Sequence, residues 1–279
     1  MKQLTPQRQR SAFTGFKGCL GIGLCLACLL LPWPVEARRY KPPSGDPPND
    51  SFSSNGSRAP GFRHCASAQT VSTQTETDQP PPLPLTLFSP LSHVGRTTTT
   101  TPTLVWFIPV TEPYRLRLSL FALDSDQNTV LLHELEYVEQ ASGVIQYTLP
   151  DNQSELQTGQ RYIVRLSLAC NSTSDRFNQS FVTELDIKAP SPTLKQALSQ
   201  AKTPQAKAAL YAEAGYWFDT VRELLVDATQ SKSYAQVRTL LKELAESEKA
   251  EDYRQTLVQL AETLKDDDLG PSADGPKAP

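Results

Sequence analysis

The stretch LQTGQRYIVRLSLAC, residues 156–170, carries a clear fold signal. Apolar or core-type residues stand at every second position, the period of a β-strand with one buried face. They are Tyr162, Val164, Leu166, Leu168 and Cys170. Just before them, Leu156, Gly159 and Tyr162 have the spacing of a tyrosine corner, in which the phenol bonds to the backbone upstream. The stretch therefore predicts a sandwich strand whose far end carries Cys170 toward the core.

Further strands are expected on both sides of this stretch. RLRLSLFAL, residues 115–123, alternates leucines with Arg115, Arg117 and Ser119, which indicates one buried and one exposed face. The remaining candidate strands cover residues 83–88, 103–109, 129–137, 144–149 and 181–187. Strands in this number, without helices between them, predict an antiparallel β-sandwich of immunoglobulin-like architecture over residues 61–189. Cys170 follows the corner tyrosine at a longer distance than in immunoglobulin domains, so the spacing departs from that superfamily.

After Ile187 the apolar period changes to that of an α-helix. Ser191-Pro192 and Thr203-Pro204 each combine an N-cap residue with proline at the first helical position. Two later apolar stripes are out of phase across residues 247–252, which predicts two helices joined by a tight turn. The stripes are Val237, Leu240, Leu241, Leu244 and Tyr253, Leu257, Leu260, Ala261, Leu264. We expect a small all-α domain at 190–266 and a disordered tail at 267–279.

Four aromatic residues crowd into LYAEAGYWFDTVRELL, residues 210–225: Tyr211, Tyr216, Trp217 and Phe218. Gly215 allows a turn between a helix that begins at Pro204 and one that begins at Trp217, and the pair resembles one tetratricopeptide-type hairpin. A single hairpin does not make a solenoid, which needs at least three repeats. The aromatic side chains are expected either to pack in the core or to form a partner interface, because Tyr and Trp dominate interface hot spots.

The N-terminus predicts export. Four basic residues precede an apolar run from Gly18 to Leu31, and Val35-Glu36-Ala37 supplies small residues for a cleavage site. The run is shorter than the roughly 20 residues of a membrane span. Acylation at Cys28 is disfavoured, because a cysteine stands where a lipoprotein signal has a branched aliphatic residue. We expect a signal peptide at 1–37, cleavage after Ala37, and a periplasmic or extracellular protein without a membrane span.

The segment that follows, residues 38–60, is rich in proline and small polar residues and predicts a disordered linker. Loss of the leader would leave Cys65 and Cys170 as the two cysteines. An even pair in an oxidising compartment predicts a disulfide, with two buried free thiols as the alternative. The formal net charge is -3, and residues 38–279 carry 23 basic and 29 acidic side chains. This balance argues against nucleic-acid binding, which needs a clustered basic face.

No local motif predicts catalysis, a cofactor or a metal ion. His64 and Cys65 supply only two of the three or four ligands that zinc needs. Residues 124–128, DSDQN, open like a calcium loop but lack the later glycine and glutamate of an EF-hand. Glu134 and Glu136 alternate with apolar residues, as on an exposed strand face, and His133 is expected to be a hydrogen-bonded core or sheet-end residue.

A family resemblance appears when six segments are read in order: SRAPGFRHCA, LPLTLFSP, TTTPTLVWFIPV, GVIQYTLP, LQTGQRYIVRLSLAC and ALYAEAGYWFDTVRELL. Over about residues 58–245 the chain resembles the largely cyanobacterial family known as domain of unknown function 928. The resemblance implies an exported protein with a strand-rich half before a helical half, and it implies no activity.

The sequence thus predicts an exported, non-catalytic binding or scaffolding protein, whose partner is another protein of the cell envelope. The alternative is a cell-envelope hydrolase with a non-local active site around His133 or His64. A third reading is a purely structural envelope component, without an exposed apolar patch on its helices. The sequence predicts neither the ligand nor the oligomeric state.

Overall fold

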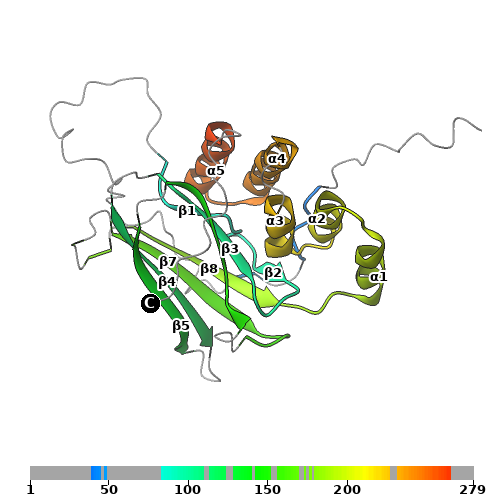
Figure 1. Ribbon diagram of the computed structural model, residues 1–279, viewed down its shortest axis with the longest axis horizontal. Coiled ribbons are helices and arrows are strands. Elements are labelled where there is room, and N and C mark those ends of the chain that lie inside the picture. Colours follow the sequence, from blue (N-terminus) through cyan, green and yellow to red (C-terminus); the bar gives the residue numbers. More distant parts are fainter. Residues whose placement is uncertain are drawn as a thin grey trace, which may run out of the picture. The chain divides into compact units, whose positions relative to one another are not determined.

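The computed structural model describes residues 39–44, 47–48, 83–109, 113–123, 128–139, 142–151, 156–169, 173, 176–177, 179–226 and 231–264. These residues contain eight strands followed by five helices (Figure 1). The predicted order of a strand-rich half and a helical half is therefore confirmed. The predicted leader, the cysteine pair, most of the predicted linker and the tail lie outside the described residues.

The strands form two sheets. The larger sheet has the order β2-β8-β7-β4-β5 and the smaller one has the order β1-β3-β6. The strand bounds are β1 Thr86–Leu87, β2 Gly95–Thr97, β3 Thr103–Ile108, β4 Tyr114–Leu123, β5 Thr129–Glu139, β6 Gly143–Thr148, β7 Arg161–Ala169 and β8 Gln179–Ile187. Each of the seven stretches predicted to be strands contains one, and β2 is an addition to them.

Strand β2 corrects the expected antiparallel architecture. It pairs in parallel with β8, with Gly95 opposite Leu185 and Thr97 opposite Ile187. The other strand pairs of the described residues are antiparallel. Three residues are too few to show a period of two, and their partner strand lies far along the chain. The larger sheet is therefore mixed.

Alternation along the strands separates an inner from an outer face of the larger sheet. On β4, Tyr114, Leu116 and Leu118 are fully buried, whereas Arg115 and Arg117 between them are half-buried. Strand β3 is buried along its whole length, so both faces of the smaller sheet are covered there. The main hydrophobic cluster joins the inner residues of both sheets.

The helices are α1 Pro192–Gln200, α2 Pro204–Glu213, α3 Trp217–Leu225, α4 Ser231–Ser247 and α5 Glu251–Thr263. Both predicted N-caps are confirmed, because the side chains of Ser191 and Thr203 each accept a backbone hydrogen bond of 3.1 Å. Helices α4 and α5 are separate, as the out-of-phase stripes predicted. No helix among the described residues has the length and apolar character of a membrane span.

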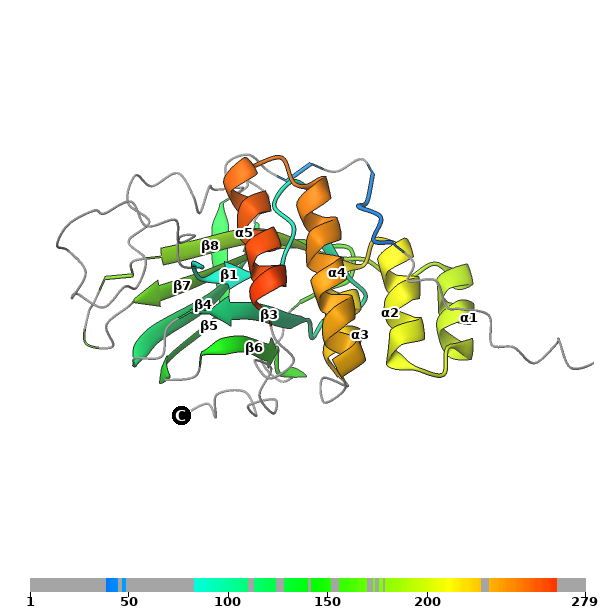
Figure 2. The ribbon, with the colours of Figure 1, turned by 90° about the horizontal axis from the view of Figure 1, so that it is seen from above.

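Helices α3 and α5 pack on the sheets and share their core. Figure 1 shows β1 and β3 between the helices and the strands of the larger sheet, and Figure 2 shows α4 and α5 side by side. The Trp217 indole donates to the Phe88 carbonyl at 2.7 Å, and the Tyr253 hydroxyl donates to the Ser89 carbonyl at 2.7 Å. Tyr253 also contacts Phe181 of β8, with ring centroids 5.5 Å apart. One hydrophobic cluster thus crosses the expected boundary at residue 189.

The close approach of β2 to α3 depends on a missing side chain. A Cβ atom at Gly95 would lie 2.5 Å from Cε2 of Phe218, a separation that real Cβ atoms do not adopt. Gly95 therefore lets the ring of Phe218 lie directly on the backbone of β2. In this way the extra strand connects the larger sheet to the helices.

The tyrosine corner lies where the chain enters β7. The hydroxyl of Tyr162 accepts a hydrogen bond of 2.7 Å from the backbone N–H of Gln157, which is the upstream contact that the spacing predicts. Leu156 and Tyr162 are both buried, and Gly159 has a φ of 91°, a left-handed conformation that glycine adopts without strain. These contacts fix the start of the strand relative to the core.

Residues 39–44 do not follow the expectation of a disordered linker. Tyr40 is buried with 4% exposure, its backbone N–H donates to Glu243 Oε2 at 2.9 Å, and the N–H of Lys41 donates to the Ala212 carbonyl at 3.0 Å. Tyr40 is a large aromatic side chain that packs in the core, although the residues around it are proline-rich and polar. The start of the predicted linker is therefore packed on α2 and α4.

Candidate ligand-binding face

The aromatic residues of α2 and α3 do not form the partner interface that their clustering suggested. Trp217 and Phe218 are 0% and 2% exposed and belong to the main hydrophobic cluster. The Trp217 ring meets the edge of Tyr40, with centroids 4.9 Å apart, and its only N–H is used by Phe88. Both rings are core residues, so they cannot present a surface to a partner.

Tyr211 and Tyr216 form a second, smaller cluster with Leu194 of α1. Their rings meet edge to face at 6.2 Å, and the Tyr216 hydroxyl donates to the Ala189 carbonyl at 3.1 Å. Both side chains are buried. They hold α1 and the end of β8 against the α2–α3 turn, which is the core alternative of the two that the sequence left open.

The predicted disulfide between Cys65 and Cys170 cannot be located, because both residues lie outside the described residues. The same holds for His64 and for the calcium-like stretch 124–127. Among the residues that the structure does describe, no three His, Cys, Asp or Glu side chains come together as a metal site.

The two described histidines each contact a tyrosine. His93 Nε2 lies 2.8 Å from the Tyr40 hydroxyl in the core, and burial together with the charge of Arg96 lowers the pKa of His93 to about 4. His133 Nε2 lies 3.3 Å from the Tyr147 hydroxyl, which links β5 to β6, and partial burial lowers its pKa. Both histidines are hydrogen-bonded structural residues in this geometry.

Two buried carboxylates hold the loop around β2 on the helices. Asp219 of α3 accepts hydrogen bonds of 2.8 Å from the backbone N–H and the hydroxyl of Thr98. Glu248 accepts from the N–H groups of Leu91 and Ser92, both at 2.9 Å, and from the Ser92 hydroxyl. Burial raises the pKa of each carboxyl group. Their oxygens are occupied by the protein itself.

The outer face of the larger sheet carries many charged side chains. Strand register places these on it: Arg96, Arg115, Arg117, Arg161, Arg165 and Lys188, with Glu134, Glu136, Glu184 and Asp186. Basic residues outnumber acidic residues on this face, although the whole chain has a net charge of -3. The acidic groups pair across strands, as in Arg161 with Glu184 at 3.3 Å, and along β8, as in Lys188 with Asp186 at 3.4 Å.

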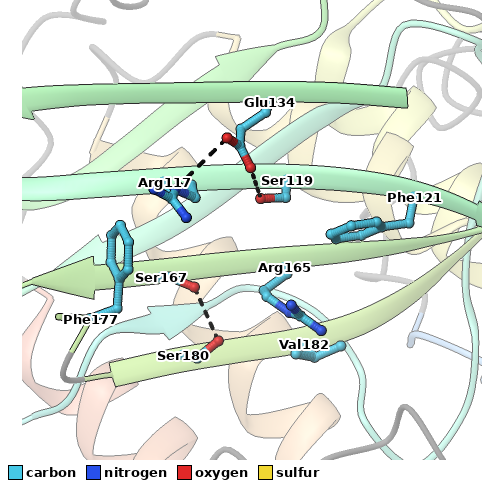
Figure 3. A pocket seen from close by; sticks show the side chains of 9 residues that line it. All are labelled: Arg117, Ser119, Phe121, Glu134, Arg165, Ser167, Phe177, Ser180 and Val182. Carbon is cyan, nitrogen blue, oxygen red and sulfur yellow. Dashed lines mark hydrogen bonds and ion pairs between the residues drawn. The ribbon is translucent and has the colours of Figure 1, made fainter. Parts of the chain in front are cut away.

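A hollow of about 420 Å³ lies in the middle of this face (Figure 3). Strand β4 contributes Arg117, Ser119 and Phe121 to its lining, and β7 contributes Arg165 and Ser167. Strand β5 adds a glutamate and β8 adds a serine and a valine, while Phe177 borders it beside Arg117. The hollow therefore combines cations, hydroxyl groups and aromatic rings on a rigid sheet.

The two arginines of the hollow are used differently. Arg117 Nε donates to Glu136 Oε2 at 2.6 Å, and its guanidinium lies over the Phe177 ring at 4.5 Å. Arg165 is exposed, and its guanidinium lies over the Phe121 ring at 5.3 Å. Within the described residues Arg165 has no ion pair and no hydrogen bond. Its five N–H donors are therefore free for a ligand while the ring restrains the group.

Three serines add hydroxyl groups beside these arginines. Ser119 donates to Glu134 Oε2 at 3.1 Å, and the hydroxyls of Ser167 and Ser180 lie 3.2 Å apart (Figure 3). One hydroxyl of the Ser167–Ser180 pair donates to the other, so the second keeps its hydrogen for another acceptor. The hollow can thus offer hydrogen bonds to an oxygen-rich, negatively charged group.

The sequence contains a signal for this face that is no local motif. Arginine and serine alternate with core residues on both β4 and β7, so their side chains share one face once the strands pair. What the alternation could not show is register, which sets Ser119 opposite Arg165 and Arg117 opposite Ser167. The exposed face expected for Glu134 and Glu136 agrees with their exposure and their pairing to Arg117 there.

Comparison with known proteins supports a family and no activity. No curated protein matches the chain. The sequence model of the family described as Domain of Unknown Function (DUF928) matches residues 57–258, most of the chain. The resemblance seen in the six segments is thereby confirmed, and the chain belongs to the DUF928 family.

Proposed function

We propose that this protein is an exported, non-catalytic binding or scaffolding protein of the cell envelope that holds an acidic partner on the outer face of its larger sheet. The observation that carries the proposal is Arg165, an exposed cation that has no ion pair or hydrogen bond among the described residues and lies in a hydroxyl-lined hollow. Charged groups that serve stability alone pair with one another, as the others on this face do.

Two further features support binding over catalysis. The described histidines use their Nε2 atoms on tyrosine hydroxyls, and the buried carboxylates are occupied by backbone N–H groups and hydroxyls. The leader-like N-terminus supports the envelope as the place of action. In this proposal the two sheets form an immunoglobulin-like support, and α2 with α3 forms one tetratricopeptide-like hairpin that braces it.

Cosedimentation with the insoluble envelope fraction of the producing cells tests this function. The wild-type protein is expected to pellet with the fraction at low salt, and Ser180→Glu should reduce the pelleted amount at least tenfold, because the new carboxylate occupies Arg165. Ser199→Glu, on the exposed side of α1, is the matched control and should pellet like the wild type. Far-UV circular dichroism checks that both variants are folded.

Equal pelleting of wild type and Ser180→Glu would remove the sheet face from the proposal. Absence of pelleting by the wild-type protein at low salt would remove the envelope partner itself.

A further inference from the structure

We propose that the hollow binds the carboxylate groups of an acidic polysaccharide that carries one uronate per sugar unit or fewer. This inference rests on the proposed function and names its ligand class. It assigns Arg165 as the carboxylate-binding residue and the Ser167–Ser180 pair as hydroxyl donors or acceptors for the sugar.

The guanidinium of Arg165 suits a carboxylate because its planar fork matches two oxygens at once. Stacking on Phe121, at 5.3 Å, restrains the plane of the group, so less entropy is lost when a ligand binds. Ser167 and Ser180 stand on the neighbouring β7 and β8 positions, opposite each other in the register. When a uronate carboxylate binds Arg165, hydroxyls of the same sugar chain can form hydrogen bonds with these two serines.

Fixed negative charge beside the hollow limits the charge density of the ligand. Glu134 lines the hollow and Glu136 pairs with Arg117 at its border. A densely charged polymer, such as a nucleic acid or a highly sulfated glycan, would bring several anions against these carboxylates at once. A uronate chain carries at most one carboxylate per sugar, so one carboxylate can lie on Arg165 while uncharged sugar hydroxyls face the glutamates.

The position of the hollow also separates a polysaccharide from a peptide. Peptides that bind sheets add a strand at an open edge, where backbone groups are unpaired. This hollow is lined mainly from β4, β7 and β8, which are interior strands of the larger sheet, and the edge strand β5 contributes Glu134. The exposed valines and leucine that could anchor a protein partner, Val130, Leu131 and Val138, lie on the edge strand β5 instead. A hydroxyl-rich chain fits the floor of the hollow better than an apolar peptide side chain.

Affinity electrophoresis tests the assignment with four polymers in the gel: polygalacturonate, dextran sulfate, neutral dextran and duplex DNA. Wild-type protein is expected to be retarded by polygalacturonate with an apparent Kd at least tenfold below that for each of the other three. Arg165→Gln should weaken polygalacturonate binding at least tenfold, and Arg165→Lys should weaken it severalfold because the charge remains and the fork is lost. Arg254→Gln, which removes an exposed arginine of α5, should bind like the wild type.

Each failure has its own meaning. Stronger retardation by dextran sulfate or DNA would overturn the uronate assignment, because binding would then depend on the charge density of the polymer. Unchanged polygalacturonate binding by Arg165→Gln would overturn the role of the hollow. Absence of polygalacturonate binding, together with envelope pelleting that Arg165→Gln abolishes, would overturn the polysaccharide and leave the proposed function standing.

Discussion

The two sides of the larger sheet use charged residues in opposite ways. On the helix side, Asp219 and Glu248 are buried, and their oxygens accept backbone and hydroxyl hydrogen bonds that fix the loop near β2. On the outer side, the carboxylates pair with basic side chains, and Arg165 is exposed without an ion pair or hydrogen bond within the described residues. Carboxylates on the helix side therefore fix a loop to the helices, whereas the outer side keeps one exposed guanidinium, that of Arg165, without an ion pair among the described residues.

Replacement of Trp217 by alanine should have the largest effect on stability. The ring is fully buried, donates to Phe88 and contacts Tyr40, so its loss leaves a cavity and an unsatisfied carbonyl. We expect the free energy of unfolding to fall by about 3–5 kcal/mol, measured by urea denaturation. A loss below about 1 kcal/mol would mean that the helix side is not the stabilising side.

Acid should weaken the helix side through His93. Its pKa of about 4 in the folded protein lies below its ordinary value, so the neutral form contributes stability that is complete above pH 6.5 and is lost as the pH falls toward 4. The loss is roughly 3 kcal/mol. Urea denaturation of wild type and His93→Gln between pH 7 and 4 measures this loss. Glu248 and Asp219 contribute equally to both proteins, so the difference in unfolding free energy between the two reports on His93.

A slope of stability against pH that is equal in wild type and His93→Gln would contradict this assignment. The raised pKa values of Glu248 and Asp219 mean that the folded state favours their protonated forms, so their contribution is largest at low pH and is lost as the pH rises.

Matched Glu→Gln replacements compare the two sides directly. At Glu248 the amide would set an NH₂ group against the N–H donors of Leu91 and Ser92, and we expect a loss of about 1–3 kcal/mol. At Glu136, which is exposed and paired with Arg117, the loss should stay within about 0.5 kcal/mol. Thermal and urea unfolding of both variants measure the two losses. Equal losses would contradict the difference between the two sides of the sheet.

Arg165→Gln should have the smallest effect on stability. The guanidinium is exposed and its one described contact is the Phe121 ring, so unfolding should change by about 0.5 kcal/mol or less. Urea denaturation of the variant used for the polymer binding assay checks this value. A loss above about 1.5 kcal/mol would show that Arg165 is a stabilising residue and weaken the case for a ligand.

Much of the fold could be predicted because its strands alternate strictly and its helices begin at capped prolines. RLRLSLF placed β4 and its two faces, and Ser191 and Thr203 placed α1 and α2. These signals are local, so a single stretch of sequence contains them.

The parts that escaped prediction depend on contacts between distant residues. Strand β2 is defined by pairing with β8, and Tyr40 finds its place only against α2, α4 and His93. The aromatic cluster at α3 was equally ambiguous, because aromatic spacing alone does not distinguish a core from an interface. The hollow could not be predicted without the strand register, which decides whether arginines and serines on two strands lie next to each other.

The hydrogen bond from the Tyr40 backbone to Glu243 joins residues 203 positions apart. A contact of this range forms late in folding, because a long loop must close before the contact contributes. Helix α4 must therefore be synthesised before Tyr40 can pack in the core.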